Sequence, residues 1–128
     1  MTRGRIALNL LLPALVPIFL SACSKEAEIS YSQDVQPILA ANCLACHQAG
    51  GQGFEASGLS MVSYEDLMRG TEGGPMVIAG DVEGSNLLVL MEGRADPSIS
   101  MPHGSLDPVP GEDIELIRIW IAQGAKNN

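Results

Sequence analysis

Between residues 34 and 125, hydrophobic positions recur at spacings of three and four, as they do along an α-helix that buries one face. This pattern predicts four short helices, over residues 34–47, 63–70, 85–91 and about 111–123. No stretch alternates polar and apolar residues for long enough to predict a sheet. The sequence therefore predicts an all-α domain of short helices and long loops.

Polar residues and glycines mark where these helices begin and end. Asp34, Ser63 and Ser85 are the expected N-caps of the first three helices. Pro37 falls in the first turn of the first helix, where its missing N–H costs nothing. Gly124 is the expected C-cap of the last helix.

Segments rich in glycine or proline separate the predicted helices. Residues 48–58 and 71–80 are glycine-rich, and residues 93–110 carry four prolines. All three are predicted loops. The last is long for so small a domain, and such loops are usually functional or disordered.

The start of the chain has the pattern of an export signal. Arg3 and Arg5 precede an apolar run over residues 6–20, and the small residues Ser21 and Ala22 follow it. The run is shorter than the roughly 20 residues of a membrane-spanning helix. Residues 1–22 are therefore predicted to be a signal peptide.

The end of this signal favours a lipoprotein. Leu20-Ser21-Ala22-Cys23 resembles the bacterial lipobox, in which the cysteine is acylated and becomes the first residue of the mature protein. The resemblance implies lipidation at Cys23, with residues 23–30 as lipidated cysteine and tether. We therefore expect an exported protein, lipid-anchored to a bacterial membrane and facing the periplasm. Ser24, in place of an aspartate, favours the outer membrane.

The net charge of the remaining chain limits the kinds of molecule that it can bind. Removal of residues 1–22 leaves five basic and 15 acidic residues, a net charge of −10. Such a domain should be repelled by nucleic acid and by anionic lipid surfaces. Contact with the membrane must then come from the acyl chains of the lipid anchor.

The strongest chemical signal is Cys43-Leu44-Ala45-Cys46-His47, a C-x-x-C-H pattern typical of c-type haem attachment. On a helix, these positions share one face, so both thiols can reach the two vinyl groups of a haem while the imidazole points at the iron. With Cys23 assigned to lipid, all three cysteines of the chain have a role. Only 4% of the residues are aromatic, and a buried flat cofactor would enlarge so thin a core.

Two other types of site use similar residues. A thioredoxin-like C-x-x-C needs a preceding strand, whereas a helix is predicted here. A zinc site could use Cys43, Cys46 and His47, but the adjacent Cys46 and His47 are poorly spread for tetrahedral closure and the chain has no second paired cluster. The pattern therefore favours haem.

Haem iron bound by His47 has a sixth position, which a methionine thioether would close while raising the reduction potential. Five methionines are candidates: Met61, Met68, Met76, Met91 and Met101. Met68 and Met91 have the spacing of core residues, whereas Met101 lies in a loop and precedes Pro102, which favours an extended conformation. Met101 is therefore the preferred ligand. His103 is the competing ligand, although an exposed loop side chain is the favoured interpretation for it.

Several segments together resemble the planctomycete-type cytochrome c domain, a relative of class I cytochromes c. They are residues 35–39, 42–47, 58–61, 80–88, 101–102 and 120–125, in the order found in that family. The resemblance implies an all-helical fold over residues 31–128, covalent haem at Cys43 and Cys46, and axial ligands His47 and Met101. This chain has His103 where family members often carry a second proline.

These features predict a monohaem c-type cytochrome with one covalently attached haem c per chain. We expect one-electron transfer to redox partner proteins at the periplasmic side of the membrane, with no enzymatic reaction and no small-molecule substrate. The alternatives are a haem enzyme or ligand sensor with an open or labile sixth position, and a haem subunit of a larger oxidoreductase.

Overall fold

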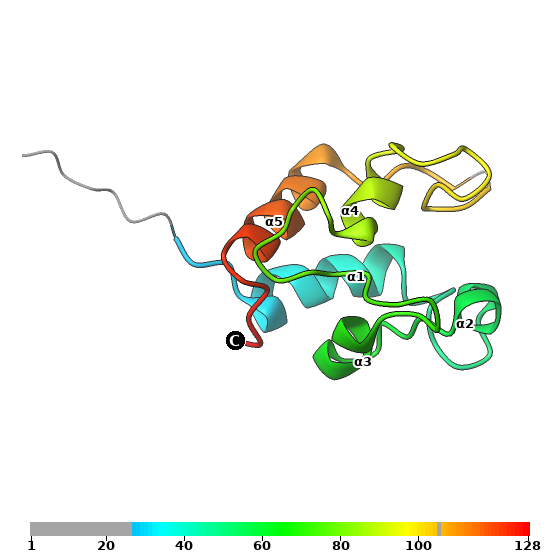
Figure 1. Cartoon of the computed structure of the whole chain (residues 1–128), viewed down its shortest axis with the longest axis horizontal. Coiled ribbons are helices and arrows are strands. Elements are labelled where there is room, and N and C mark those ends of the chain that lie inside the picture. Colours follow the sequence, from blue (N-terminus) through cyan, green and yellow to red (C-terminus); the bar gives the residue numbers. More distant parts are fainter. Residues whose placement is uncertain (1–26, 105) are drawn as a thin grey trace, which may run out of the picture.

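The computed structural model describes residues 27–104 and 106–128, so the predicted signal peptide and Cys23 lie outside the described residues. In this part of the chain the backbone forms helices and isolated bridges but no strand, which confirms the predicted all-α class (Figure 1). The elements are a π-helical turn η1 (Tyr31–Val35) and the α-helices α1 (Gln36–Asn42), α2 (Gln52–Ser57), α3 (Tyr64–Arg69), α4 (Asn86–Met91) and α5 (Gly111–Ala122).

The first helical segment begins earlier than predicted. Ser30, not Asp34, is the N-cap of η1, and its hydroxyl accepts a hydrogen bond from the Gln33 N–H. Asp34 instead accepts a hydrogen bond from the Ser30 N–H through its carboxylate, at 2.8 Å. The two side chains thus satisfy free N–H groups reciprocally, as in a capping box. Pro37 lies in the first turn of α1, as predicted.

Helix α2 lies within residues 48–58, where the sequence predicted only a loop, and that prediction was wrong. Gly53 lowers the helix propensity of this segment, and the neighbouring glycines give it the composition of a loop, so a pattern-based prediction does not find the helix. The helix forms because Phe54 N–H donates to the Cys46 carbonyl at 2.9 Å, which ties it to the preceding turn. Gly58 ends it with φ of +71°, a conformation that favours glycine.

The caps of the later helices agree in part with the sequence. Ser63 caps α3, as predicted, because its hydroxyl accepts from the Asp66 N–H at 3.1 Å. Ser85 precedes α4 but does not cap it through its side chain. Its hydroxyl donates to the Asp81 carbonyl at 2.6 Å and accepts from the Ile78 N–H. Gln123 is the C-cap of α5, and Gly124 follows it.

The core is organised around α5. Ile117, Trp120 and Ile121 are fully buried, and α5 packs against η1 and α4. The Trp120 ring lies 5.6 Å from the Tyr31 ring, and its Nε1–H donates to the Lys126 carbonyl at 2.9 Å. This aromatic cluster supplies large buried area, so few rings suffice for the core.

Helix α2 and the segment of residues 93–110 lie at the same end of the molecule, with α1 leading towards them (Figure 1). At the opposite end of the molecule, the first described residues contact the C-terminus, since Ser32 N–H donates to the Asn128 carbonyl at 3.0 Å. None of the helices in the described ranges has the length and apolar character needed to cross a bilayer.

Candidate functional site

The Cys43–His47 motif lies in turns that follow α1, not on the helix itself. Helix α1 ends at Asn42, and Cys43 is its C-cap. The Cys46 and His47 N–H groups both donate to the Cys43 carbonyl, at 3.1 and 3.0 Å. The predicted helix over the whole motif was wrong. These turns nevertheless bring the three side chains to one cavity, because they retain the i to i+3 and i+4 bonding of a helical turn.

His47 is buried and held by the backbone on both sides. Its exposed fraction is 7%, and its Nδ1 lies 3.3 Å from the Leu59 carbonyl oxygen. Its own carbonyl accepts from the Met61 N–H at 2.8 Å. A Nδ1–H that donates to Leu59 leaves Nε2 as the free lone pair, which is the tautomer that binds a metal.

The His47 ring packs closely against the backbone of α2, which has room for it because residue 53 is a glycine. A Cβ atom at Gly53 would lie 2.7 Å from His47 Cε1 and 2.8 Å from Nε2. Likewise, a Cβ atom at Gly51 would lie 2.4 Å from the Cys46 carbonyl oxygen. Gly51, the N-cap of α2, and Gly53, in its first turn, therefore allow the helix to pack directly on the motif.

The two thiols differ in their surroundings. Cys43 is half-buried and Cys46 is exposed, and the two are not joined in a disulfide. Burial and, second, the neighbouring Cys46 raise the pKa of the Cys43 thiol to about 11. Cys43 is therefore a neutral thiol at physiological pH, unlike the low-pKa thiolate of a disulfide oxidoreductase.

Cys43, Cys46 and His47 line one cavity of about 640 Å³. Helix α4 contributes apolar side chains to the cavity wall, among them Leu87 and Leu90. The segment of residues 93–110 also lines the cavity, through Ile99, Met101, Pro102, His103, Leu106 and Val109. The volume and apolar lining are those of a site that encloses a cofactor.

The preferred candidate for the sixth position, Met101, and its competitor, His103, both line this cavity. Met101 is half-buried and His103 is exposed, as expected for a loop side chain. Met61, Met76 and Met91 also line the cavity but are buried in the hydrophobic core. Met68 does not line it and packs against the core instead. The cavity thus groups Met101 and His103 with the attachment motif.

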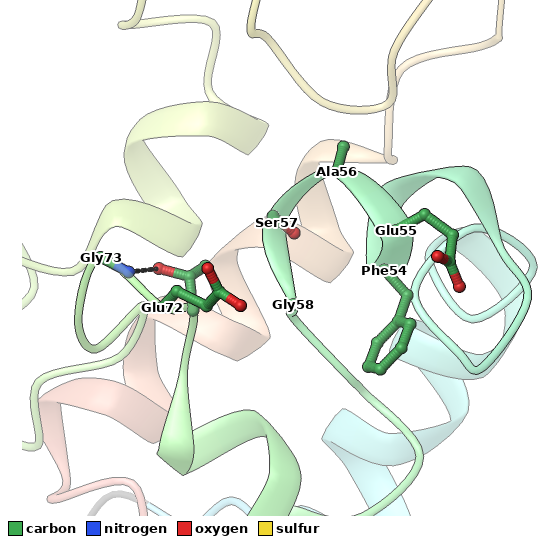
Figure 2. Close-up of a pocket in the computed structure, with 8 residues that line it drawn as sticks. Phe54, Glu55, Ala56, Ser57, Gly58, Glu72 and Gly73 are labelled. Atoms are coloured by element: carbon green, nitrogen blue, oxygen red, sulfur yellow. Dashed lines mark hydrogen bonds between the residues drawn. The ribbon is translucent and has the colours of Figure 1, made fainter.

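A second, open pocket lies beside the cavity, where the end of α2 faces the turn at residues 71–73 (Figure 2). Glu55 and Glu72 are on its wall, and both are exposed. The Gly73 N–H donates to the Thr71 hydroxyl at 3.1 Å, and the Glu72 N–H donates to the Ser57 carbonyl at 3.4 Å. The first bond closes the turn, and the second ties it to the last residue of α2.

The structure also bears on the competing types of site. No strand precedes the motif in the described residues, so the thioredoxin-like arrangement is absent from them. Within those same residues, no three histidine, cysteine or carboxylate side chains gather into a metal site. A zinc centre at Cys43, Cys46 and His47 therefore has no support from the geometry.

Comparison with protein families gives a match between residues 43–103 and the family described as planctomycete cytochrome C. This match, which covers slightly less than half of the chain, supports a planctomycete-type cytochrome c domain. The match begins at the first cysteine of the motif and ends at His103. A cytochrome c domain indicates a haem-containing electron-transfer protein. Comparison with curated proteins and with solved structures gave no significant match.

The residues of this cytochrome c domain fit a covalently held haem. Two thiols and one buried imidazole open into a single apolar cavity, and the glycine at position 53 leaves the imidazole edge uncovered by a side chain. Cys43 and Cys46 would carry the haem, and His47 would bind its iron from one side. The donor set is that of a c-type haem rather than of a zinc or iron–sulfur site.

Sequence reasoning missed three contributors to this cytochrome c site. Gly51 and Gly53 were interpreted only as loop residues, and Leu59 was not assigned a role. Glycines directly after the motif are a weak signal, since close backbone approach is one of their few functions. The Leu59 carbonyl has no signal in the sequence, because any residue carries one.

Proposed function

We propose that this protein is a monohaem c-type cytochrome that transfers single electrons at the periplasmic side of a bacterial membrane. Haem would be attached through Cys43 and Cys46, with His47 and Met101 as axial ligands. Cys23 would carry the lipid that holds the domain near the membrane, with the outer membrane preferred. Redox proteins on or near the same membrane would be its partners.

One observation carries the proposal: the C-x-x-C-H motif and the Met101 segment line the same apolar cavity. These residues are separated by more than fifty positions in the sequence, and the fold brings them to one enclosed space. Two protein ligands would keep the coordination of the haem iron the same in both oxidation states, which suits an electron carrier.

When bound, haem supplies reversible one-electron cycling between ferric and ferrous iron. The chain's residues control its environment. The Leu59 carbonyl holds the His47 ring in one orientation and increases its basicity as a ligand. Apolar side chains such as Leu87 and Leu90 exclude water, which limits reorganisation of the solvent during electron transfer. Cys46 is exposed, so the attachment side of the cavity is close to the surface.

The test is to express the full chain with a c-type haem maturation system and measure the mass of the product. We expect one haem per chain, a ferric spectrum with the weak far-red band of methionine ligation, and no response of the reduced protein to carbon monoxide. The Cys43→Ala/Cys46→Ala variant is the control and should carry no covalent haem. A wild-type product of unmodified mass would overturn the proposal.

The main alternative is a haem enzyme or ligand sensor with an open sixth position. His103, exposed at the cavity, is the observation in its favour, because it could act on a bound ligand. Against it, no arginine or lysine among the described residues lines the cavity. Arg69 and Arg94 are engaged in ion pairs instead. Rapid binding of carbon monoxide by the reduced protein would favour this alternative.

The proposed anchoring has its own test. A Cys23→Ser variant should leave the membrane fraction, whereas wild type should be labelled by a palmitate precursor. A wild-type protein that partitions into the soluble fraction without lipid would contradict the anchor and leave the haem chemistry untouched. Co-purification with a membrane oxidoreductase would instead indicate a subunit of a larger complex.

A further inference from the structure

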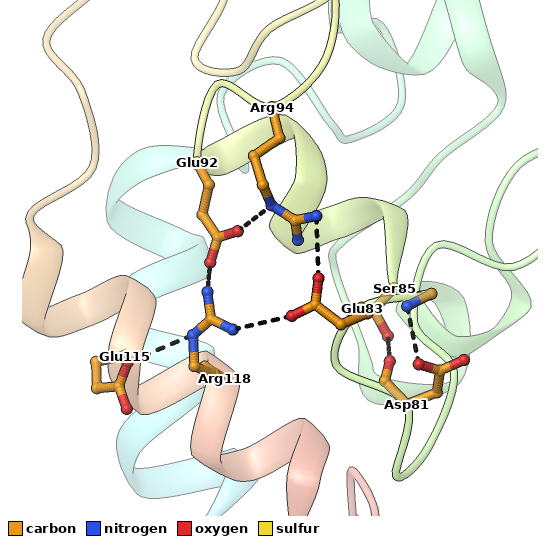
Figure 3. A network of polar contacts seen from close by, with 8 residues as sticks. Asp81, Glu83, Ser85, Glu92, Arg94, Glu115 and Arg118 are labelled. Atoms are coloured by element: carbon orange, nitrogen blue, oxygen red, sulfur yellow. Dashed lines mark hydrogen bonds and ion pairs between the residues drawn. The ribbon is translucent and has the colours of Figure 1, made fainter.

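We propose that a cluster of five charged residues acts as a positioning device for the segment of residues 93–110, which lines the cavity opposite the attachment motif. The members of this Glu92 cluster are Glu83, Glu92, Arg94, Glu115 and Arg118 (Figure 3). The inference rests on the proposed function, because this segment would supply the sixth ligand of the iron. The inference identifies the residues that keep that ligand in place.

Glu92 is the centre of the cluster. It is the C-cap residue of α4, and its two carboxylate oxygens bind different arginines. One oxygen accepts from Arg94 Nε at 2.5 Å, and the other accepts from Arg118 Nη2. Arg94 is the second residue of the segment, whereas Arg118 belongs to α5. A single carboxylate therefore links α4, the segment and α5.

Glu83 closes the cluster into a ring, as Figure 3 shows. Its carboxylate lies 3.3 Å from Arg94 Nη1 and 3.8 Å from Arg118 Nη1. Glu115, one turn before Arg118 on α5, lies 3.4 Å from Arg118 Nε. The two arginines thus have three carboxylates around them, and the cluster carries a net charge of −1.

The exposure of the three glutamate side chains indicates which ion pair contributes most to holding the segment. The side chain of Glu92 is 14% exposed, whereas those of Glu83 and Glu115 are 78% and 60% exposed. Exposed ion pairs are screened by solvent and contribute little. Removing one partner of a sheltered pair leaves an uncompensated charge and costs more. The positioning effect is therefore expected to depend chiefly on Glu92 and its two arginines.

The cluster controls the start of a segment that has a second attachment at Met101. The Arg94 N–H donates to the Val89 carbonyl at 3.0 Å, and the Met101 N–H donates to the Leu90 carbonyl at 3.2 Å. Both bonds end on α4, so the segment leaves this helix and returns to it. If Glu92 releases Arg94, the side-chain link between the start of the segment and α5 is lost, and the backbone bonds at Arg94 and Met101 carry more of the task of holding the segment against the cavity.

Helix α5 gives the cluster a rigid base. Ile117, directly before Arg118 in α5, and Trp120, two residues after it, are fully buried in the core. Arg118 therefore connects Glu92, and through it the segment, to a helix that is fixed in the core. The cluster thus connects the core helix α5 with the segment that lines the cavity.

The experiment uses the full chain with haem attached and compares Glu92→Gln with Asp66→Asn. The control removes the carboxylate of the Arg69–Asp66 ion pair on α3, which does not line the cavity. Imidazole titration of the ferric protein measures how easily the sixth position opens. We expect Glu92→Gln to bind imidazole about tenfold more tightly, equivalent to about 1.4 kcal/mol. Its far-red band should weaken, and Asp66→Asn should match wild type.

Two further variants make the result specific. Arg118→Gln should act like Glu92→Gln, and the double variant should bind imidazole no more tightly than the stronger single variant, because both remove one interaction. Should Glu92→Gln fail to accumulate, Arg94→Gln provides the test. Its side chain is 38% exposed and the Glu92–Arg118 contact remains, so a smaller increase of about threefold is expected.

The outcomes separate this inference from the proposed function. Wild type without covalent haem would overturn the proposed function itself. With haem attached, unchanged imidazole affinity in Glu92→Gln and Arg94→Gln would overturn the positioning role, even if urea unfolding showed a loss of stability. An equal increase in Asp66→Asn would also overturn it, since general destabilisation would then explain the effect.

Discussion

The two walls of the cavity are held in different ways. On the attachment wall, the backbone around Cys46 and His47 is bonded to α2 and to residues 59–61, and glycines allow contact without side chains between them. On the opposite wall, the segment of residues 93–110 returns to α4 through one bond at Met101 and starts at the Glu92 cluster. Ile99 and Leu106 on this wall are 54% and 59% exposed.

This difference matches the chemistry proposed for each wall. Covalent attachment and a buried imidazole require one fixed geometry, which many short-range backbone contacts provide. A sixth ligand from a loop forms a weaker and exchangeable bond, so its strength depends on how well the loop is held. The first wall should therefore respond to substitution with complete loss of the site, and the second with graded changes.

The sharpest contrast is between the two histidines, one on each wall. His47→Ala removes the only imidazole that the attachment wall places in the cavity, so we expect no His-ligated haem spectrum. His103→Ala changes an exposed side chain and should retain the wild-type spectrum. Absorption spectra of both matured variants provide the measurement. Loss of the far-red band in His103→Ala would instead make His103 the ligand.

Within the attachment wall, the Cys43 thiol should be unreactive before haem is attached. Its pKa is raised from 9.0 to about 11, so about a hundredfold less thiolate is present at pH 8 than in an ordinary thiol. The alkylation rate of Cys43 in the haem-free Cys46→Ser variant should therefore keep rising up to about pH 11. Because this variant lacks the charge of Cys46, a modest decrease in the midpoint is expected, since burial is the larger cause. A midpoint below pH 9 would show that Cys43 is not buried in this way.

On the opposite wall, Met101→Leu should keep covalent haem but open the sixth position. Leucine has a similar volume and no thioether, so the wall should retain its packing. We expect loss of the far-red band and at least about tenfold tighter binding of imidazole. Met68→Leu is the matched control, because Met68 does not line the cavity. If both variants keep the band, another residue is the ligand.

The smallest expected effect concerns the packing of α2 on the attachment wall. Gly53→Ala places a Cβ atom 2.7 Å from the His47 ring, and overpacking of this kind costs about 1–3 kcal/mol of unfolding free energy. Gly111→Ala is the control, because a Cβ atom there meets nothing within 4 Å. Urea unfolding of the haem-free proteins compares the two. Equal stability would show that α2 can move away from the ring.

The sequence predicted the chemistry of the site better than its framework. Cys43, Cys46 and His47 could be recognised because their roles depend on residue type and spacing alone. Ser63 as a cap and the last helix were predicted for the same reason, since caps and helical periodicity are local properties. Helix α2 was missed because Gly53 disfavours a helix locally, whereas contacts with distant parts of the chain, such as the Cys46 carbonyl, stabilise it.

By itself, the sequence determined the helical class, the acidic charge and the residues that can carry and bind a haem. These depend on residue type and on spacing over a few positions. Only the tertiary structure decided that Gly53 lies against the His47 ring, that Leu59 orients it, and that Glu92 joins α4 to α5. Each of these contacts joins residues from different elements, and no local pattern encodes the packing that brings them together.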